Sequence, residues 1–345
     1  MTPLASLAEP RHSTIRRVAV HVPEGRQSAT EIEDEMRSRN PGLHLRPGLL
    51  RQMYGFEERR VAPADAWPSD LAAAAARRLL DECGLGPEAV DLLVFASASE
   101  DLEEPATAHV VADRLGVTAP VFDVKNACNG VLNAVEIADA LIRAGRYRRV
   151  LIVTGERGSA LSRLPVRDRD ELALRLPAFT LGDLGAALLL EASDRPGLLG
   201  IRSFANSAGW RAATVTNPYF SPGAPVTALR FDSQALAAAF TGMEKEAMDA
   251  LREWGREPGE LDLVCVHQPS VPFTHAILDS TGIARDRAMV TFPRYGNVAT
   301  GSLPLQLVEA AERDRLHPGD LVAFIGLASG ASAGLLLMEW HPDPA

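Results

Sequence analysis

Short apolar segments alternate with longer amphipathic segments along this chain. Residues 90–96 are almost all apolar, as expected for a strand in a sheet that is covered on both faces. Between 69 and 83, apolar residues recur at helical spacing, and Ser69 is expected to cap that helix. A helix expected at 129–144 places Val131 and Val135 on one face. The alternation predicts an α/β fold with buried strands.

The same reasoning predicts the remaining elements of the first half. We expect strands at 17–22, 121–125, 149–154 and 186–191, and a helix near 106–115. Segments 157–180 and 207–232 interrupt the alternation and are expected to line or cover a pocket.

The second half of the chain repeats the pattern of the first. Residues 87–95 resemble residues 258–266, and each segment follows a long amphipathic helix. This similarity indicates a duplicated architecture, although unrelated helix–turn–strand units also resemble one another. We expect one half to span residues 1–195 and the other to span residues 196–345.

Composition narrows the class of protein. The 345 residues carry a formal net charge of −10 and no block of basic residues, which argues against a nucleic-acid partner. No signal peptide and no apolar run long enough to span a bilayer is visible, so no membrane association is expected. Three scattered cysteines are too few for a disulfide framework or a zinc site. We therefore expect a cytoplasmic protein without a metal.

Three residues with useful chemistry follow predicted strands. Cys128 comes after the strand at 121–125, His267 follows the strand that ends at 266, and a strand near 290 is expected to end at Asn297. Because functional groups of α/β proteins collect at such strand ends, the three are expected to meet. Singly, each has an ordinary alternative: a packing thiol, a hydrogen-bonded histidine and a helix cap.

The position of Cys128 before a helix also predicts its charge. The first turn of a helix and a nearby imidazole both favour a thiolate, which would lower the thiol pKa below ~8.5. Iodoacetamide is therefore expected to modify Cys128 faster than Cys83 or Cys265.

The sequences around these residues resemble the active-site motifs of the ketoacyl-acyl-carrier-protein synthase III group of the thiolase superfamily. The matching segments are Asn126-Ala-Cys128-Asn-Gly, Val266-His267-Gln-Pro and Tyr295-Gly-Asn297-Val-Ala, with Tyr54-Gly-Phe-Glu-Glu-Arg59 and Gly182-Asp183 as further matches. The resemblance runs from about residue 15 to the C-terminus. It implies a thiolase-like fold, in which two pseudo-repeated βαβαβ halves form a five-layered α-β-α-β-α core.

The resemblance also implies a reaction. Cys128 would be acylated by an acyl-CoA or an acyl-carrier-protein thioester, with no permanently bound cofactor. The backbone N–H groups of Cys128 and of the loop at Ser329 and Gly330 would hold the oxyanion. The acyl group would then condense with a malonyl-type thioester with loss of CO2, while His267 and Asn297 stabilise the enolate. The family is dimeric, and an edge strand near 118–124 could pair across a two-fold axis.

Several positions depart from the usual family pattern. Leu49 stands near the position of an adenine-stacking tryptophan, and Pro272 replaces an arginine that docks the carrier protein. Glu104 and Ser270 replace other residues of the substrate pocket and are expected to line it. These departures imply a specialised-metabolism enzyme, of the polyketide type, with a different acyl group.

Two alternatives stay open at this point. An acyltransferase of the same fold would move the acyl group to a carrier protein, hydroxyl or amine without decarboxylation. A scaffold that has lost catalysis is disfavoured because all three motif residues are present. Asp183 is expected to stabilise the site through hydrogen bonds.

Overall fold

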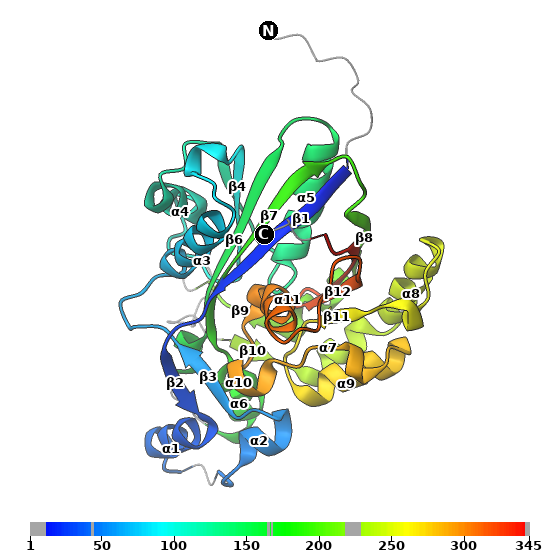
Figure 1. The fold of residues 1–345 in the computed structure, drawn as a ribbon. Helices are drawn as coiled ribbons and strands as arrows, with labels where there is room; N and C mark the ends of the chain where they lie inside the picture. The colour runs from blue at the N-terminus through cyan, green and yellow to red at the C-terminus, as the bar shows by residue number, and fades with distance from the viewer. Residues whose placement is uncertain (1–11, 43–44, 164–165, 167, 218–228, 342–345) are drawn as a thin grey trace.

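Two mixed β-sheets form the centre of the molecule (Figure 1). The computed structural model describes residues 12–42, 45–163, 166, 168–217 and 229–341. The first sheet has the order β1-β7-β6-β4-β5, with β1 at His12–His21, β4 at Leu92–Ala96, β5 at Val121–Val124, β6 at Arg149–Arg157 and β7 at Asp183–Ser193. The second has the order β11-β12-β13-β8, with β8 at Leu198–Ala205, β11 at Leu263–Val266, β12 at Leu321–Ala328 and β13 at Ser332–Glu339.

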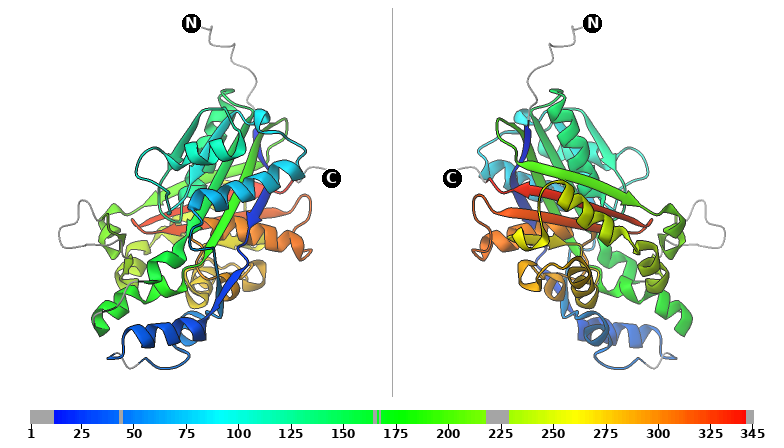
Figure 2. Two further views of the ribbon diagram at one scale, coloured as in Figure 1. Left: turned by 90° about the vertical axis from the view of Figure 1, so that its left-hand side faces the viewer. Right: turned by 90° about the vertical axis from the view of Figure 1, so that its right-hand side faces the viewer.

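Helices separate and cover the two sheets, giving five layers (Figure 2). Helices α3 (Pro68–Glu82) and α4 (Thr107–Leu115) cover the outer face of the first sheet. Helices α5 (Gly130–Arg143) and α11 (Ser302–Glu312) lie between the sheets and contact strands of both. Helices α8 (Met243–Glu253) and α9 (Val271–Thr281) pack on the other side of the second sheet. The layered α/β arrangement expected from the sequence is confirmed.

The apolar pattern explains this layering. Every residue of β4 and β12 is buried, because each strand has a helix layer on both faces. On α5, the residues expected on one face, Val131 and Val135, belong to the apolar cluster between the sheets. Burial of this large apolar surface supplies the main driving force for folding.

The predicted repeat of a helix, a turn and a buried strand is present in both halves. After α3, a 3₁₀ turn at Pro87–Ala89 leads into β4, and after α8 a 3₁₀ turn at Pro258–Glu260 leads into β11. Both strands pair in parallel with a neighbour. Strands of the first sheet end at 193 and strands of the second begin at 198. We propose that the boundary between the halves lies in this connection, as expected near 195.

Smaller elements extend from the layered core. The two-stranded antiparallel sheet of β2 (Gly25–Ser28) and β3 (Glu58–Val61) packs with α1 (Ala29–Arg39) and α2 (Leu49–Tyr54) at one end of the molecule (Figure 1). The segment predicted as an insertion at 157–180 contains α6 (Arg169–Arg175), and the one at 207–232 contains β9 (Ala213–Val215) and β10 (Leu229–Phe231). Helix α7 (Ser233–Phe240) follows β10. None of the helices in the described part of the chain is long and apolar enough to cross a membrane.

Two local predictions are wrong. Helix α3 begins at Pro68 with Trp67 as its N-cap, and Ser69 lies inside the first turn, where its N–H donates to Asp101 at 2.9 Å. Proline is well tolerated at the first helical position, which explains the earlier start. The strand expected to end at Asn297 is instead the short helix α10 (Phe292–Tyr295).

Candidate active site

Cys128, His267 and Asn297 line one cavity of about 880 Å³. Cys128 follows β5, His267 follows β11, and Asn297 follows α10. Residues from both halves of the chain, which are far apart in sequence, are therefore brought together as the sequence predicted.

A sharp turn presents Cys128 to the cavity. Ala127 has a φ of 43°, in the left-handed region that non-glycine residues rarely adopt. The turn is held by the N–H of Asn129, which donates to Asn126 O at 3.0 Å, and by the N–H of Gly130, which donates to Ala127 O at 3.2 Å. Asn129 is the N-cap of α5, so Cys128 lies one residue before the cap.

The turn is also fixed from the opposite half of the molecule. Asn129 Nδ2 donates to Ser332 Oγ at 3.1 Å, at the start of β13. Strand β12 carries Gly326 at this contact, and a Cβ there would lie 2.1 Å from Asn129 Oδ1. Close approach of the two halves at the nucleophile therefore requires a glycine.

The charge state expected for Cys128 is contradicted. Burial and the nearby Glu156 carboxylate raise the pKa of Cys128 to about 12. Burial lowers the pKa of His267 to about 4. A protonated thiol therefore faces a neutral imidazole at neutral pH, because the cost of desolvating charge outweighs the attraction of the helix start.

Hydrogen bonds of the backbone and of two glutamines place His267. Its N–H donates to Ile325 O at 2.9 Å, which continues the parallel pairing of β11 with β12. The neighbouring Gln268 accepts from the N–H groups of Thr291 at 2.9 Å and Phe292 at 3.0 Å, and so ties β11 to α10. Gln306 on α11 bonds both backbone groups of Val266. His267 Nδ1 is buried and has no hydrogen-bond partner among the described residues.

Asn297 is fixed by its backbone and by one end of its amide. Its N–H donates to Thr180 O at 2.9 Å, and its carbonyl accepts from Gly182 N at 3.0 Å. Its Oδ1 accepts from Ala299 N at 2.9 Å. Because Oδ1 already accepts this bond, the group of the Asn297 amide that can bind a ligand is the Nδ2 donor.

A buried acid of the cavity, Glu156, was not predicted from the sequence. It stands near the end of β6, is 1% exposed and lines the cavity with Cys128. Burial raises the pKa of its carboxyl group, although several hydrogen bonds oppose this shift. The available signal was an acidic residue two positions beyond the strand predicted at 149–154.

The predicted oxyanion loop connects β12 and β13. Ser329 lines the cavity, whereas Gly330 is not among its described lining residues. The loop is anchored by Ala331 and Asn206, whose backbone groups exchange hydrogen bonds of 3.0 and 2.8 Å.

The expected stabilising role of Asp183 is confirmed. This fully buried carboxylate accepts from Ala62 N at 2.9 Å, from Ser159 N at 2.9 Å and from Ser159 Oγ at 2.8 Å. It therefore joins the end of β3, the segment after β6 and the start of β7.

The residues expected in the substrate pocket differ in their placement. Ser270 lines the cavity, and its Oγ also caps α9 by accepting from Phe273 N at 3.1 Å. Glu104 is exposed and is not among the described lining residues of this chain, whereas the adjacent Glu103 is.

The positions with altered family residues have structural roles as well. Leu49 begins α2 and packs against the apolar cluster beside that helix. Tyr54, at the end of α2, lines the cavity instead. Pro272 is in the first turn of α9, where a proline is well tolerated.

Most of the cavity wall is apolar. The first half of the chain contributes Trp67 and Leu102, and the second half contributes several larger side chains. The latter are Val215, Leu229, Phe231, Leu236, Phe240, Phe273 and Leu327. No group of residues suited to hold a metal ion is present in the described part of the chain. The cavity is therefore suited to an apolar group attached to a polar reacting centre.

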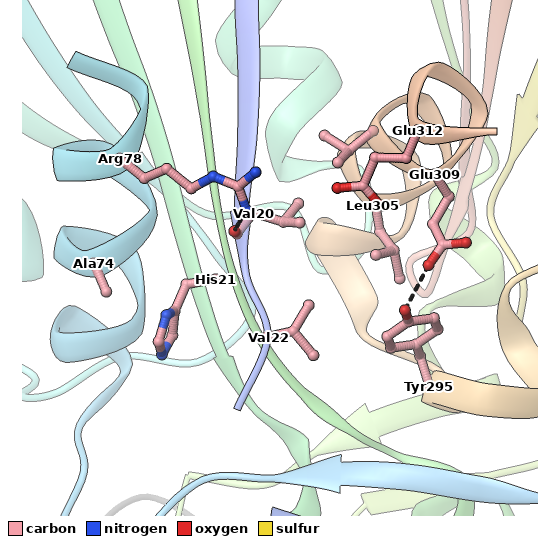
Figure 3. Close-up of a pocket in the computed structure, with 10 residues that line it drawn as sticks. Val20, His21, Val22, Ala74, Arg78, Tyr295, Leu305, Glu309 and Glu312 are labelled. Carbon is pink, nitrogen blue, oxygen red and sulfur yellow. Dashed lines mark hydrogen bonds between the residues drawn. The ribbon is translucent and has the colours of Figure 1, made fainter. Parts of the chain in front are cut away.

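A smaller crevice of about 290 Å³ lies apart from this site (Figure 3). Arg78 from α3 and Glu309 from α11 approach it from opposite sides of β1, and Tyr295 donates to Glu309. None of Cys128, His267 and Asn297 lines this crevice. The predicted chemistry is confined to the larger cavity.

Comparison with known proteins agrees with the geometry. The family model described as 3-oxoacyl-[acyl-carrier-protein (ACP)] synthase III matches residues 122–207, and the model of the C-terminal part of that enzyme matches residues 251–340. These ranges contain Cys128, His267 and Asn297.

Solved structures of related enzymes share the fold over nearly the whole chain. A cysteine-to-serine variant of Xanthomonas campestris OleA with bound lauric acid and lauroyl-CoA is 27% identical, with a TM-score of 0.87 and coverage of 96% of this chain and 100% of that chain. Cerulenin-bound OleA from the same organism is 27% identical, with a TM-score of 0.87 and coverage of 95% and 97%. The 3-oxoacyl-[acyl-carrier-protein] synthase III of Aquifex aeolicus VF5 is 25% identical, with a TM-score of 0.82 and coverage of 95% and 100%.

The thiolase-like fold and the resemblance seen in the three motifs are thus confirmed together. The chain belongs to the 3-oxoacyl-[acyl-carrier-protein] synthase III family and is a ketosynthase III-like enzyme.

Proposed function

We propose that Cys128 accepts an acyl group from a CoA or carrier-protein thioester and that this group condenses with a malonyl-type thioester with loss of CO2. The observation that supports this most is the meeting of a thiol, an imidazole and an oriented amide donor in one largely apolar cavity. No resident cofactor is needed for this chemistry.

In the acylation step, the Cys128 thiol gives its proton to the neutral imidazole of His267 as the sulfur attacks the thioester carbonyl. The backbone N–H of Cys128 and one from the loop at Ser329 and Gly330 hold the oxyanion. The departing thiolate takes the proton back from His267. A neutral imidazole is the right partner here, because it can accept this proton.

In the condensation step, the malonyl group loses CO2 and leaves an enolate. His267 and Asn297 Nδ2 donate to the enolate oxygen, and the enolate carbon attacks the acyl group on Cys128. The new carbon–carbon bond replaces the carbon–sulfur bond, and Cys128 leaves as a thiolate that takes up a proton from solvent to restore the thiol. An amide at position 297 suits this role because it donates a hydrogen bond without taking up a proton.

We propose an apolar acyl group longer than acetyl. The cavity of about 880 Å³ is walled by aromatic and branched side chains from both halves. Lauroyl-CoA is bound in a structure of the related OleA, which supports a fatty acyl chain. From an acyl group of this kind we infer a role in fatty-acid-related or polyketide specialised metabolism.

We propose a cytoplasmic homodimer that pairs through the edge strand β5. This strand is the last in its sheet, and its outer edge has no partner strand in the described chain. Glu104 is exposed on the loop before α4, and we propose that it contributes to the pocket across the dimer. The three cysteines are free thiols, in keeping with a reducing compartment.

The proposal is tested by a panel of acyl-CoA and acyl-carrier-protein thioesters, followed by intact-mass measurement. We expect an acyl adduct on Cys128 that is absent from Cys128→Ala. Adding labelled malonyl thioester should then release labelled CO2 and form a condensed product. The absence of an adduct with every donor would favour a scaffold.

Two other outcomes would replace the condensation step. Transfer of the acyl group to an acceptor without carbon–carbon bond formation would establish an acyltransferase. A condensed product without CO2 release would show that a second acyl thioester supplies the nucleophilic carbon.

A further inference from the structure

Glu156 is a buried acid that the proposed reaction does not use. Its side chain lines the cavity beside Cys128, and the whole residue is 1% exposed. A carboxylate is costly to bury unless its oxygens are well hydrogen-bonded. The hydrogen-bond partners of this carboxylate therefore indicate the role of Glu156.

Both oxygens of Glu156 accept hydrogen bonds from two separate loops. Oε1 accepts from Ala98 N at 2.9 Å and from the Thr300 hydroxyl. Oε2 accepts from Ser99 N at 3.2 Å and from Ser99 Oγ at 2.8 Å. The Thr300 hydroxyl in turn contacts Thr154 Oγ1. Because all these partners donate to the carboxylate, they oppose the rise of its pKa that burial causes.

These bonds connect the turn after Asn297 to the loop after β4. Thr300 is three residues beyond Asn297, and Gly130 is two residues beyond Cys128. A Cβ on Gly130 would lie 3.3 Å from Thr300 Cγ2, so the two turns are in contact. Glu156 thus ties Thr300, which lies against the start of α5 just after Cys128, to the loop after β4.

The other charges that face the cavity do not offset this carboxylate. Lys125 pairs with Glu100 at 2.8 Å near the surface, where the two side chains are 59% and 42% exposed. Arg157 donates to Pro63 O at 2.9 Å, and its Nε lies 3.6 Å from Asp183. These are the two cations among the described lining residues, while further carboxylates at Asp101 and Glu103 are also present. Burial keeps His267 neutral by lowering its pKa to about 4.

We propose that Glu156 is a positioning residue for the acylation step: it holds Thr300, in the turn after Asn297, against the loop after β4, and, by opposing negative charge on the sulfur, it keeps Cys128 a neutral thiol until a thioester binds. This rests on Cys128 being the residue that carries the acyl group. Once Cys128 is acylated, its sulfur carries no charge and the repulsion no longer acts. Glu156 therefore favours the loaded enzyme over a free thiolate.

The test compares the pH dependence of iodoacetamide modification of Cys128 in the wild type and in Glu156→Gln. Peptide mass spectrometry follows Cys128, with Cys83 and Cys265 as internal references. We expect the midpoint of the profile to fall by about one pH unit or more when the charge is removed. A merely structural role would leave the midpoint unchanged, and an unchanged or higher midpoint in the folded variant overturns the proposal.

Glu33→Gln is the matched control. Glu33 is 2% exposed and accepts from Gly48 N at 2.7 Å and Leu50 N at 2.9 Å, next to α2. It does not line the cavity, so its replacement should leave the Cys128 midpoint where it is. A shift equal to that of Glu156→Gln would show a general effect on the fold and would also overturn the proposal.

Glu156→Asp keeps the test decisive if Glu156→Gln does not fold. The shorter side chain retains the charge, so the midpoint should stay within about half a pH unit of the wild type, a small part of the shift expected when a neighbouring charge is removed. A fall to the value of an ordinary thiol would show that packing, not charge, controls Cys128. Alkylation needs no acyl donor, so failure here is distinguishable from failure to form the acyl adduct.

Discussion

Asn129 Nδ2 donates a hydrogen bond to Ser332 Oγ at 3.1 Å, joining the residue next to the nucleophile to the opposite half of the molecule. Asn129 is 2% exposed, and its Oδ1 already has no hydrogen-bond partner among the described residues. The contact with Ser332 is therefore the one hydrogen bond described for this amide group.

Replacing Ser332 with alanine should leave the Asn129 amide without a side-chain partner. We expect Ser332→Ala to lower the free energy of unfolding by about 1–3 kcal/mol, the cost of an unsatisfied buried donor. Urea denaturation measures this change. Ser280→Ala removes an exposed hydroxyl on α9 and should change the free energy by less than about 0.5 kcal/mol. Equal effects of the two substitutions would contradict the structural role of Ser332.

Gly182 is required for the close approach of β7 to the turn before Asn297. A Cβ at this position would lie 2.1 Å from Tyr295 O, and the Gly182 N–H also donates to Asn297 O at 3.0 Å. Gly182→Ala should therefore displace Asn297 and slow condensation by about 100-fold, as small misplacements of reacting groups can do. Acylation of Cys128 should be affected less, because that step does not use Asn297.

Gly259→Ala is the control for that substitution, since nothing lies within 4 Å of a Cβ there. Single-turnover assays on both variants separate the acylation rate from the condensation rate. Loss of both rates to the same extent in Gly182→Ala would count against a specific role of Asn297 in condensation.

His267 should make stability depend on pH in the acidic range. Burial lowers its pKa from 6.5 to about 4, so between these values the unfolded state binds a proton that the folded state does not. Stability contributed by neutral His267 is therefore lost as the pH falls from 6.5 to 4, by about 3 kcal/mol in total.

Chemical denaturation at several pH values between 4 and 7 measures this loss. His267→Asn lacks the titrating group and should lose about 3 kcal/mol less than the wild type over the same interval. If the free energy of unfolding changed equally with pH in the two proteins, burial would not be what keeps the imidazole of His267 neutral.

The edge strand β5 should be covered in solution by a second copy of the chain. Its side chains Phe122 and Val124 pack on the central apolar cluster, while its outer backbone edge is unpaired in the described chain. Sedimentation velocity at micromolar concentration should give a dimer. A monomer at that concentration would rule out the proposed pairing and the contribution of Glu104 across it.

How far the sequence predicts this molecule depends on the range of the interactions involved. Strand β4, and the position of Cys128 between a strand and a helix, could be predicted from the sequence because local apolar spacing determines both. The element before Asn297 was not predicted, since it is a short helix with Pro293 in its first turn and with Gly296, which has a φ of 68°, at its end. Motif similarity nevertheless identified Asn297 correctly as a residue of the cavity.

The charge of the site could not be predicted in the same way. A helix start is visible in a sequence, but the burial of Cys128 and His267 depends on both halves of the chain. Glu156 was missed because its partners Ala98 and Thr300 lie 58 and 144 residues away. The sequence thus located the reacting groups but not the environment that sets their protonation.

The division of the site between two halves has a consequence for the synthesis of the protein. During translation, Cys128 and Glu156 leave the ribosome well before His267 and Asn297 are made. The newly made first half therefore has the sulfur of Cys128 and the acid that lines the same cavity, but neither the imidazole nor the amide that would stabilise the enolate. The cavity that holds all three reacting groups is therefore complete only after residues of both halves have been made.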